Sequence, residues 1–213
     1  MRRHFDRRLA LLFAAALMVS GGAAAGASPS KPVPDDMSMG NPKAAVTVVE
    51  YASASCPHCA RFNNNVLPAF KKKYVDTGKV RYVFREFLTQ PVEIAEIGFM
   101  LARCAGDKKY FSAIDTFFRG QDEMYRTRNP GPLINSVGAK AGLSPAQIEA
   151  CLSDEAARKA LDDRVNSYAV NDQIEYTPTF VINGVKLPEM DHEVGLADLD
   201  LAIGPLLSKS GRP

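Results

Sequence analysis

Two cysteines separated by only two residues stand where a run of strand-forming residues gives way to a helix-like run. The stretch reads VTVVEYASASCPHCARF over residues 46–62 and contains Cys56 and Cys59. The first turn of a helix has unpaired N–H groups and the positive end of the helix dipole, so a thiolate on Cys56 is stabilised there. Cys59, one turn further on, can close a short disulfide and should be the more buried. The pattern predicts an attacking cysteine and a resolving cysteine.

The two residues between the cysteines favour an oxidising pair. A protonated His58 adds positive charge beside the Cys56 sulfur and lowers the pKa of that thiol. A more stable thiolate favours the reduced form, which makes the disulfide a stronger oxidant. Pro57 has no N–H and its fixed φ suits the first helical turn. The sequence therefore indicates an oxidant rather than a reductant.

Other uses of the C-x-x-C spacing have to be weighed. A structural zinc site needs four donors, and after residue 27 the chain has only His58 and His192 besides its four cysteines, so we expect no metal. A Cys–His hydrolase with His192 as base for Cys56 lacks any further signature, and His192 is better explained as a loop or cap residue. A purely structural bridge across so short a loop would stabilise little.

The first 27 residues have the features of a secretory signal peptide. Four arginines precede an apolar run of eleven residues, Leu9–Val19, and Ala25-Gly26-Ala27 fits a cleavage signal. The apolar run is too short to cross a hydrocarbon core of about 30 Å. We expect cleavage after Ala27, and export to a compartment where disulfides form.

Loss of this segment changes the charge of the chain. The full sequence carries +2 and residues 1–27 carry +3, so the mature chain carries about −1. Without a basic face, a nucleic-acid partner is not expected. Residues 28–44 are polar and rich in proline, which predicts an extended arm. The remaining length suits one domain with an insertion.

The hydrophobic pattern predicts the order of the elements. Strands are expected over 45–51 and 80–87, joined by a helix over 56–74 that Pro68 kinks or splits. A β-α-β order with a crossover helix implies that the two strands are parallel. Residues 45–90 would thus form the first part of an α/β domain.

The second half of the chain changes character twice. Residues 91–171 show only helical periodicity, including a capping box at Ser144–Gln147. Strands return over 177–187, where Asn183-Gly184 marks a tight hairpin, and a last helix follows from Leu196. This order predicts a mixed sheet whose second part, residues 172–213, is separated from the first by an all-helical insertion.

VVEYASASCPHC, residues 48–59, followed by TPTFVING, residues 177–184, resembles the DsbA-type thiol oxidoreductases of the thioredoxin superfamily. The resemblance extends from about Gly40 to Leu207. It implies a thioredoxin fold interrupted by a helical domain. It also implies a periplasmic enzyme that introduces disulfides into exported proteins, with no cofactor beyond the cysteine pair.

The resemblance assigns roles at the cysteine pair. Cys56 matches the exposed nucleophile, on which a mixed disulfide with the substrate forms. Cys59 matches the buried partner, expected to attack that mixed disulfide and release the oxidised substrate. His58 matches the histidine that stabilises the thiolate.

Three further positions match the family's site. Pro178 matches a cis-proline that faces the disulfide, and the backbone of Thr177 before it would pair with an extended substrate peptide. Glu50 matches a buried acid that would lie under Cys59 and relay its proton; a surface charge at the strand end is the alternative.

The implied partners are newly exported proteins with cysteines and a quinone-linked membrane oxidase of the DsbB type. The short arm before the first strand favours a monomer over an oligomeric disulfide isomerase. An isomerase or reductase of the same fold stays open, as does a non-catalytic module that binds peptides or copper.

The remaining cysteines, Cys104 and Cys151, fall on apolar faces of expected helices in the insertion. Two buried free thiols would satisfy this pattern. In an oxidising compartment a structural disulfide between them is the favoured interpretation. Neither has a C-x-x-C partner or a nearby histidine in sequence, so a catalytic role is not expected.

Overall fold

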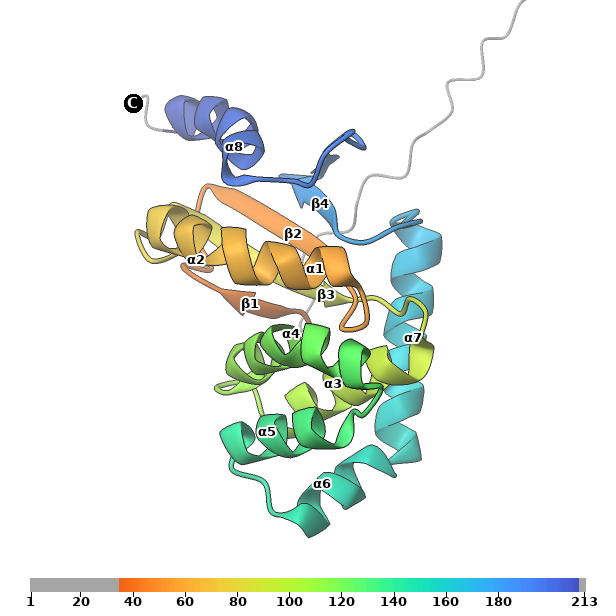
Figure 1. The fold of residues 1–213 in the computed structure, drawn as a ribbon. Helices are drawn as coiled ribbons and strands as arrows, with labels where there is room; N and C mark the ends of the chain where they lie inside the picture. Colours follow the sequence, from red (N-terminus) through yellow and green to blue (C-terminus); the bar gives the residue numbers. More distant parts are fainter. Residues whose placement is uncertain (1–34, 211–213) are drawn as a thin grey trace, which may run out of the picture.

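The structure is a computed structural model that describes residues 35–210 (Figure 1). The predicted signal peptide, residues 1–27, lies outside the described residues. No helix within residues 35–210 combines the length and the apolar character needed to cross a membrane.

A five-stranded mixed sheet forms the centre of the molecule, in the order β1-β3-β2-β4-β5. Strands β2 and β3 are parallel, as the β-α-β order predicts, and the other neighbours are antiparallel. The tight hairpin expected at Asn183-Gly184 joins β4 to β5. The strand bounds are β1 Met37–Met39, β2 Val46–Ala52, β3 Val80–Glu86, β4 Thr179–Ile182 and β5 Val185–Lys186.

The edge strand β1 was not predicted. It lies in the segment expected to be an extended arm, and it pairs with β3 so that Met37 lies opposite Phe84. Just before it, Asp36 is buried and forms an ion pair with the fully buried Arg85, 2.9 Å away. A strand of three residues is too short to show periodicity, so its place in the sheet comes from these long-range contacts.

The crossover from β2 to β3 is one run of helical turns with changing pitch. It comprises α1 (Pro57–Arg61), the π-helical η1 (Phe62–Val66), α2 (Leu67–Phe70) and the π-helical η2 (Lys71–Val75). Pro68 lies in the first turn of α2, directly after η1. Proline has no N–H to give and crowds the carbonyl four residues earlier, so an irregular turn is expected beside it.

Five consecutive helices lie between β3 and β4, in the region where only helices were expected. They are α3 (Val92–Cys104), α4 (Tyr110–Thr127), α5 (Gly131–Ala141), α6 (Pro145–Leu152) and α7 (Glu155–Asn171). The capping box at Ser144 is formed. Figure 1 shows α3 to α6 gathered at one end of the sheet, while α7 runs back along it. The last described element is α8 (Leu196–Ser210), which contains Pro205.

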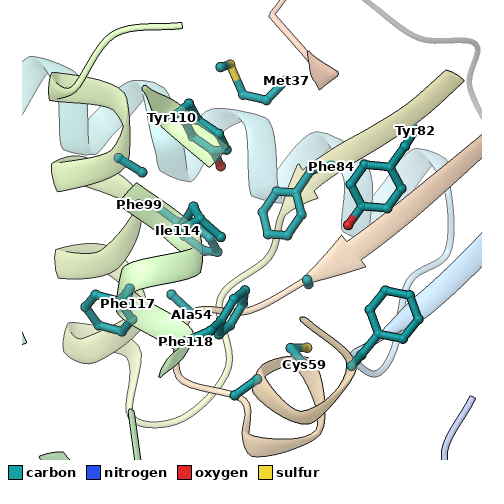
Figure 2. Close-up of a cluster of buried hydrophobic side chains, with 14 of the residues drawn as sticks. Met37, Ala54, Cys59, Tyr82, Phe84, Phe99, Tyr110, Ile114, Phe117 and Phe118 are labelled. Carbon is teal, nitrogen blue, oxygen red and sulfur yellow. The ribbon is translucent and has the colours of Figure 1, made fainter. Parts of the chain in front are cut away.

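Alternation along the strands gives the sheet two buried faces. One face packs Val48, Ala52, Tyr82 and Phe84 against the crossover helices, α3, α4 and α8. The opposite face packs Val49, Tyr51 and Val83 against Tyr168 of α7. Figure 2 shows that Cys59 belongs to the first cluster, which continues into the aromatic side chains of α4. The crossover helix and the insertion therefore share one core, with the C-x-x-C at their junction.

Candidate active site

Cys56 and Cys59 lie at the start of α1, as the sequence predicts. Cys56 is the N-cap residue, with extended backbone, and Pro57 occupies the first helical turn. Both cysteines are free thiols; Cys59 is completely buried and Cys56 is only 7 % exposed. Cys59 is thus the more buried of the two, as expected. The expectation that Cys56 is exposed is wrong, because its residue is almost completely buried at the start of α1.

The pKa of Cys56 falls from 9.0 to about 5. The largest cause is the hydrogen bond that the Cys59 thiol donates to the Cys56 sulfur, against which burial acts in the opposite direction. The Thr177 side chain and the backbone N–H groups of Cys59 and His58 lower the pKa of Cys56 further. A thiolate is therefore the dominant form at neutral pH, and the helix start supplies several of its donors.

The pKa of Cys59 moves the opposite way, well above 9.0. Burial is the main cause, and the negative charges of Cys56 and Glu50 add to it. The pair therefore divides into one sulfur that carries the charge and one that keeps its proton. Such interacting sites titrate as a unit, and the split describes how the charge is distributed within it.

Glu50 lies on β2 beneath the pair. It is only 2 % exposed, which excludes the alternative of a surface charge at a strand end. Burial raises its pKa to about 8, the hydroxyl of Tyr82 that donates to its carboxylate opposes this rise, and the Cys56 charge adds to it. At neutral pH this carboxyl group holds a proton, and Glu50 is close enough to Cys59 for its charge to raise the pKa of that thiol. Proton relay between the two groups stays a prediction.

Thr177 and Pro178 face Cys56 from the loop before β4. The Thr177–Pro178 bond is cis, and the Thr177 carbonyl oxygen lies 3.4 Å from the Cys56 sulfur. The hydroxyl of Thr177 is buried and has no hydrogen-bond partner among the described residues. A protonated Cys56 donates to the carbonyl, whereas a thiolate accepts from a hydroxyl. Thr177 therefore presents one group suited to each form of the sulfur.

The imidazole of His58 lies outside the immediate surroundings of the Cys56 sulfur. Its side chain is 59 % exposed, and Nδ1 lies 2.8 Å from Glu193 Oε1 and 2.9 Å from Arg61 Nη2. Nδ1 can donate to the carboxylate or accept from the guanidinium, but one nitrogen cannot do both. The backbone N–H of His58 lowers the pKa of Cys56, whereas stabilisation of the thiolate by the imidazole ring stays a prediction.

Arg61 and Glu193 were not singled out from the sequence. The Arg61 Nε lies 2.6 Å from Glu193 Oε1, and this contact lowers the pKa of Glu193. The two residues are 132 positions apart, so no local pattern marks them as neighbours. His192, considered as a catalytic base, contacts Asp191 and Asp198 and is exposed.

A groove of about 600 Å³ opens beside the cysteine pair. Its walls are the exposed side of α1 and η1, the cis-proline turn, and the loop from Leu187 to Gly195. Phe62 and Phe180 line the apolar part, with ring centroids 4.6 Å apart. The groove is large enough for side chains of an extended peptide lying next to Thr177.

Cys104 and Cys151 form a disulfide within the insertion. It joins the last residue of α3 to α6 across a Cα–Cα distance of 6.3 Å. No cluster of three or more potential metal-ligating His, Cys, Asp or Glu side chains occurs within residues 35–210.

The fold and the site together define a thioredoxin-like protein with a C-x-x-C at a helix start opposite a cis-proline. The family model described as thioredoxin matches residues 32–201, and the chain belongs to this family. The matched span covers the sheet, the insertion and most of the described part of the chain.

Relatives and solved structures narrow this description. The protein of Rickettsia conorii named "Putative protein-disulfide oxidoreductase RC0029" is 36 % identical over 153 residues, covering 71 % of this chain and 54 % of that protein. This chain thus spans just over half the length of that relative. Among solved structures, alpha-DsbA1 of Wolbachia pipientis has a TM-score of 0.75 and 28 % identity, covering 84 % of this chain and 94 % of that one. BdbD of Bacillus subtilis, at 20 % identity and a TM-score of 0.58, shares the fold.

Proposed function

We propose that this protein is a dithiol oxidase that introduces disulfides into exported proteins by exchange with Cys56 and Cys59. The observation that carries the proposal is the opposite displacement of the two thiols: the pKa of Cys56 is lowered to about 5 and that of Cys59 is raised. A stabilised Cys56 thiolate favours the reduced enzyme, so substrate thiols readily reduce the Cys56–Cys59 disulfide. The likeness to alpha-DsbA1 supports the same chemistry.

The reaction starts from the oxidised enzyme. A substrate thiolate attacks the Cys56 sulfur, a substrate–Cys56 bond forms, the Cys56–Cys59 bond breaks, and Cys59 leaves with the electron pair. Cys56 is the sulfur attacked because Cys59 is completely buried. The departing Cys59 takes up a proton, which the neutral carboxyl group of Glu50 would supply.

The second step differs from the role first expected for Cys59. An attack by Cys59 on the mixed disulfide would restore the enzyme disulfide and return the substrate reduced, which reverses the reaction. Oxidation requires a second thiolate of the substrate to attack the substrate sulfur of the mixed disulfide. Cys56 then leaves as the thiolate that its surroundings stabilise, and both electrons remain on the enzyme cysteines. Attack by Cys59 on the mixed disulfide is therefore the unproductive reverse reaction.

The remaining parts of the proposal concern the setting. A membrane oxidase of the DsbB type would accept the two electrons and restore the Cys56–Cys59 disulfide. The cysteine pair is the only redox group required, and the protein would act as a monomer in the periplasm after removal of residues 1–27. The groove beside Pro178 would hold the substrate chain while the sulfurs exchange.

The first test is the equilibrium of the Cys56–Cys59 pair with a glutathione buffer. We expect a reduction potential near the −120 mV of strongly oxidising DsbA and far from the roughly −270 mV of thioredoxin. A value near the lower figure would make the protein a reductant and refute the proposal. No exchange at all would favour a binding module.

A second test asks whether exported proteins pass through Cys56. In a Cys59→Ala variant, the lone Cys56 thiolate can attack a disulfide of a periplasmic protein, which forms a mixed disulfide and releases the other substrate cysteine as a thiolate. Cys59 is not there to displace the bound protein, so such adducts should accumulate on non-reducing gels. The Cys56→Ala, Cys59→Ala double variant is the matched control and should carry none. Absence of adducts from both variants would contradict a covalent role.

A further inference from the structure

The loop that delivers Cys56 is held on one side by side chains of the helical insertion. Gln121 of α4 is completely buried, and its Nε2 lies 2.7 Å from the Ala54 carbonyl oxygen and 3.4 Å from that of Cys56. The hydroxyl of Tyr125, one helical turn further along α4, donates to the carbonyl oxygen of Ser55 over 2.6 Å. Three consecutive carbonyl groups before the C-x-x-C helix are thus bound by α4.

The backbone of the insertion also approaches this loop closely. A Cβ atom placed on Gly98 of α3 would lie 2.6 Å from the Cβ of Ala54, so this glycine permits the contact. On the other side, Ser55 donates to the Thr89 carbonyl over 2.8 Å. The loop is therefore clamped between the segment after β3 and the helices α3 and α4. Figure 2 shows Ala54 next to the α4 side chains Phe117 and Phe118.

Gln121 is a costly residue in this place if packing were its only purpose. Its side chain is buried in a core of apolar residues, and its Oε1 has no hydrogen-bond partner among the described residues. A buried polar atom without a partner lowers stability. What the glutamine provides, and an apolar side chain of equal size does not, is the donor to the loop carbonyls.

The orientation of these carbonyl groups affects the stability of the Cys56 thiolate. A carbonyl oxygen is the negative end of a peptide dipole and repels a thiolate, whereas an N–H group attracts one. The contacts from α4 hold the carbonyl oxygens of residues 54–56, so their negative ends are kept toward α4. The N–H groups of His58 and Cys59, in the next peptide groups, lower the pKa of Cys56. Tyr125 is close enough for the Cys56 charge to contribute, after burial, to the raised pKa of its hydroxyl.

We propose that Gln121 and Tyr125 are positioning residues through which the helical insertion sets the oxidising strength of the cysteine pair. The insertion then acts on the chemistry as well as on the fold, although neither residue touches the reacting bond in this arrangement. This inference rests on the proposed exchange chemistry, but it can be tested on the thiolate alone.

The test uses Tyr125→Phe and Gln121→Met, each of which removes hydrogen-bond donors with little change in volume. We expect each to raise the pKa of Cys56, measured from the ultraviolet absorbance of its thiolate. We also expect each to shift the glutathione equilibrium about three- to tenfold toward the disulfide, which corresponds to a potential about 15 to 30 mV lower.

The matched control is Tyr110→Phe, which removes a hydroxyl from the same helix. The Tyr110 hydroxyl donates to Glu86 over 2.9 Å, and no hydrogen bond joins it to the active-site loop among residues 35–210. This variant should change the free energy of unfolding without changing the pKa of Cys56. The same redox shift in all three variants would show a general effect of helix packing and overturn the inference, as would shifts below twofold in folded Tyr125→Phe and Gln121→Met.

The outcomes separate this inference from the proposed function. If the unsubstituted protein fails to exchange with glutathione, the proposed oxidase activity falls, but the thiolate absorbance still reports the effect of Gln121 and Tyr125. If the protein is an oxidase and the variants retain its thiolate pKa, only the positioning role is refuted. Tyr125→Phe changes a single oxygen atom and keeps the experiment meaningful if Gln121→Met does not fold.

Discussion

The two cysteine pairs of this protein differ in almost every respect that decides what a cysteine does. Cys56 and Cys59 lie three positions apart at the start of a helix, where donors stabilise one thiolate. Cys104 and Cys151 are 47 residues apart and join two helices of the insertion. A Cys56–Cys59 disulfide would close a small loop, and forming it would remove a stabilised thiolate. The Cys104–Cys151 disulfide closes a long loop, and no stabilised thiolate is lost when it forms. The difference indicates that the surroundings of a thiol determine whether forming its disulfide lowers or raises the stability of the protein.

The largest effect should come from removing the attacked sulfur. Cys56→Ser leaves a hydroxyl that cannot form a disulfide, so oxidation of a reduced model peptide should be lost completely. The fold should persist, because the serine is close to isosteric. The measurement is the rate of peptide oxidation, with circular dichroism as the check on folding. Residual oxidation at more than a few per cent would mean that the Cys104–Cys151 pair also exchanges.

The second effect should be purely on stability. The Cys104→Ala, Cys151→Ala double variant lacks the cross-link between positions 47 residues apart. That cross-link removes chain entropy from the unfolded state, which is worth about 4 kcal/mol of stability. We expect the free energy of unfolding, from urea titration, to fall toward that amount. The glutathione equilibrium of Cys56–Cys59 should stay unchanged. An altered equilibrium in a folded double variant would show that the two pairs are coupled.

The two disulfides should also respond oppositely to reduction, with a dependence on pH. The pKa of Cys56 is lowered in the folded reduced protein, from 9.0 to about 5. A lowered pKa stabilises the folded state fully above the unfolded value, and this contribution is lost as pH falls toward the folded value. At pH 7 the lowered pKa of Cys56 contributes about 3 kcal/mol to the stability of the reduced protein, before screening by solvent. In the oxidised protein, the loop entropy removed by a bridge this short contributes about 2 kcal/mol.

Melting temperatures of the oxidised and reduced forms measure this balance. The form with Cys56–Cys59 reduced and Cys104–Cys151 intact should melt above the fully oxidised form at pH 8. The two forms should melt together at about pH 6.5, and the order should be reversed at pH 5. A reduced form that is less stable than the oxidised form at every pH would contradict a favoured Cys56 thiolate.

The smallest effect should come from Glu50→Gln. The glutamine keeps the size of the side chain but cannot give a proton to the departing Cys59, so exchange should slow by about tenfold. Because burial raises the pKa of Glu50 to about 8, the unsubstituted protein also gains stability below pH 4.5 that is lost as pH rises through 8. The variant should lose this dependence, which urea titrations across that pH range would reveal. Equal rates in both proteins would remove Glu50 from the proton path.

Much of the fold could be predicted because its signals are local. Runs of β-branched residues mark β2 and β3, and the Asn183-Gly184 turn marks the hairpin between β4 and β5. Helical periodicity from residue 91 to 171 predicted the insertion. Strand β1 escaped because three residues carry no period, and its pairing partner lies more than forty residues away. Part of the site was predictable for the same reason, because the C-x-x-C and Thr177-Pro178 are short motifs that can be recognised along the chain.

The sequence by itself determined the reactive pair, its position at a helix start and the order of sheet and insertion, because each depends on neighbours along the chain. Only the tertiary structure decided how the charge is shared between Cys56 and Cys59, since burial and donors from distant segments control each pKa. It also placed Arg61 and Glu193 together beside His58, and Gln121 and Tyr125 against the active-site loop. These contacts join residues 65 to 132 positions apart, and such distances are closed only by the packed core.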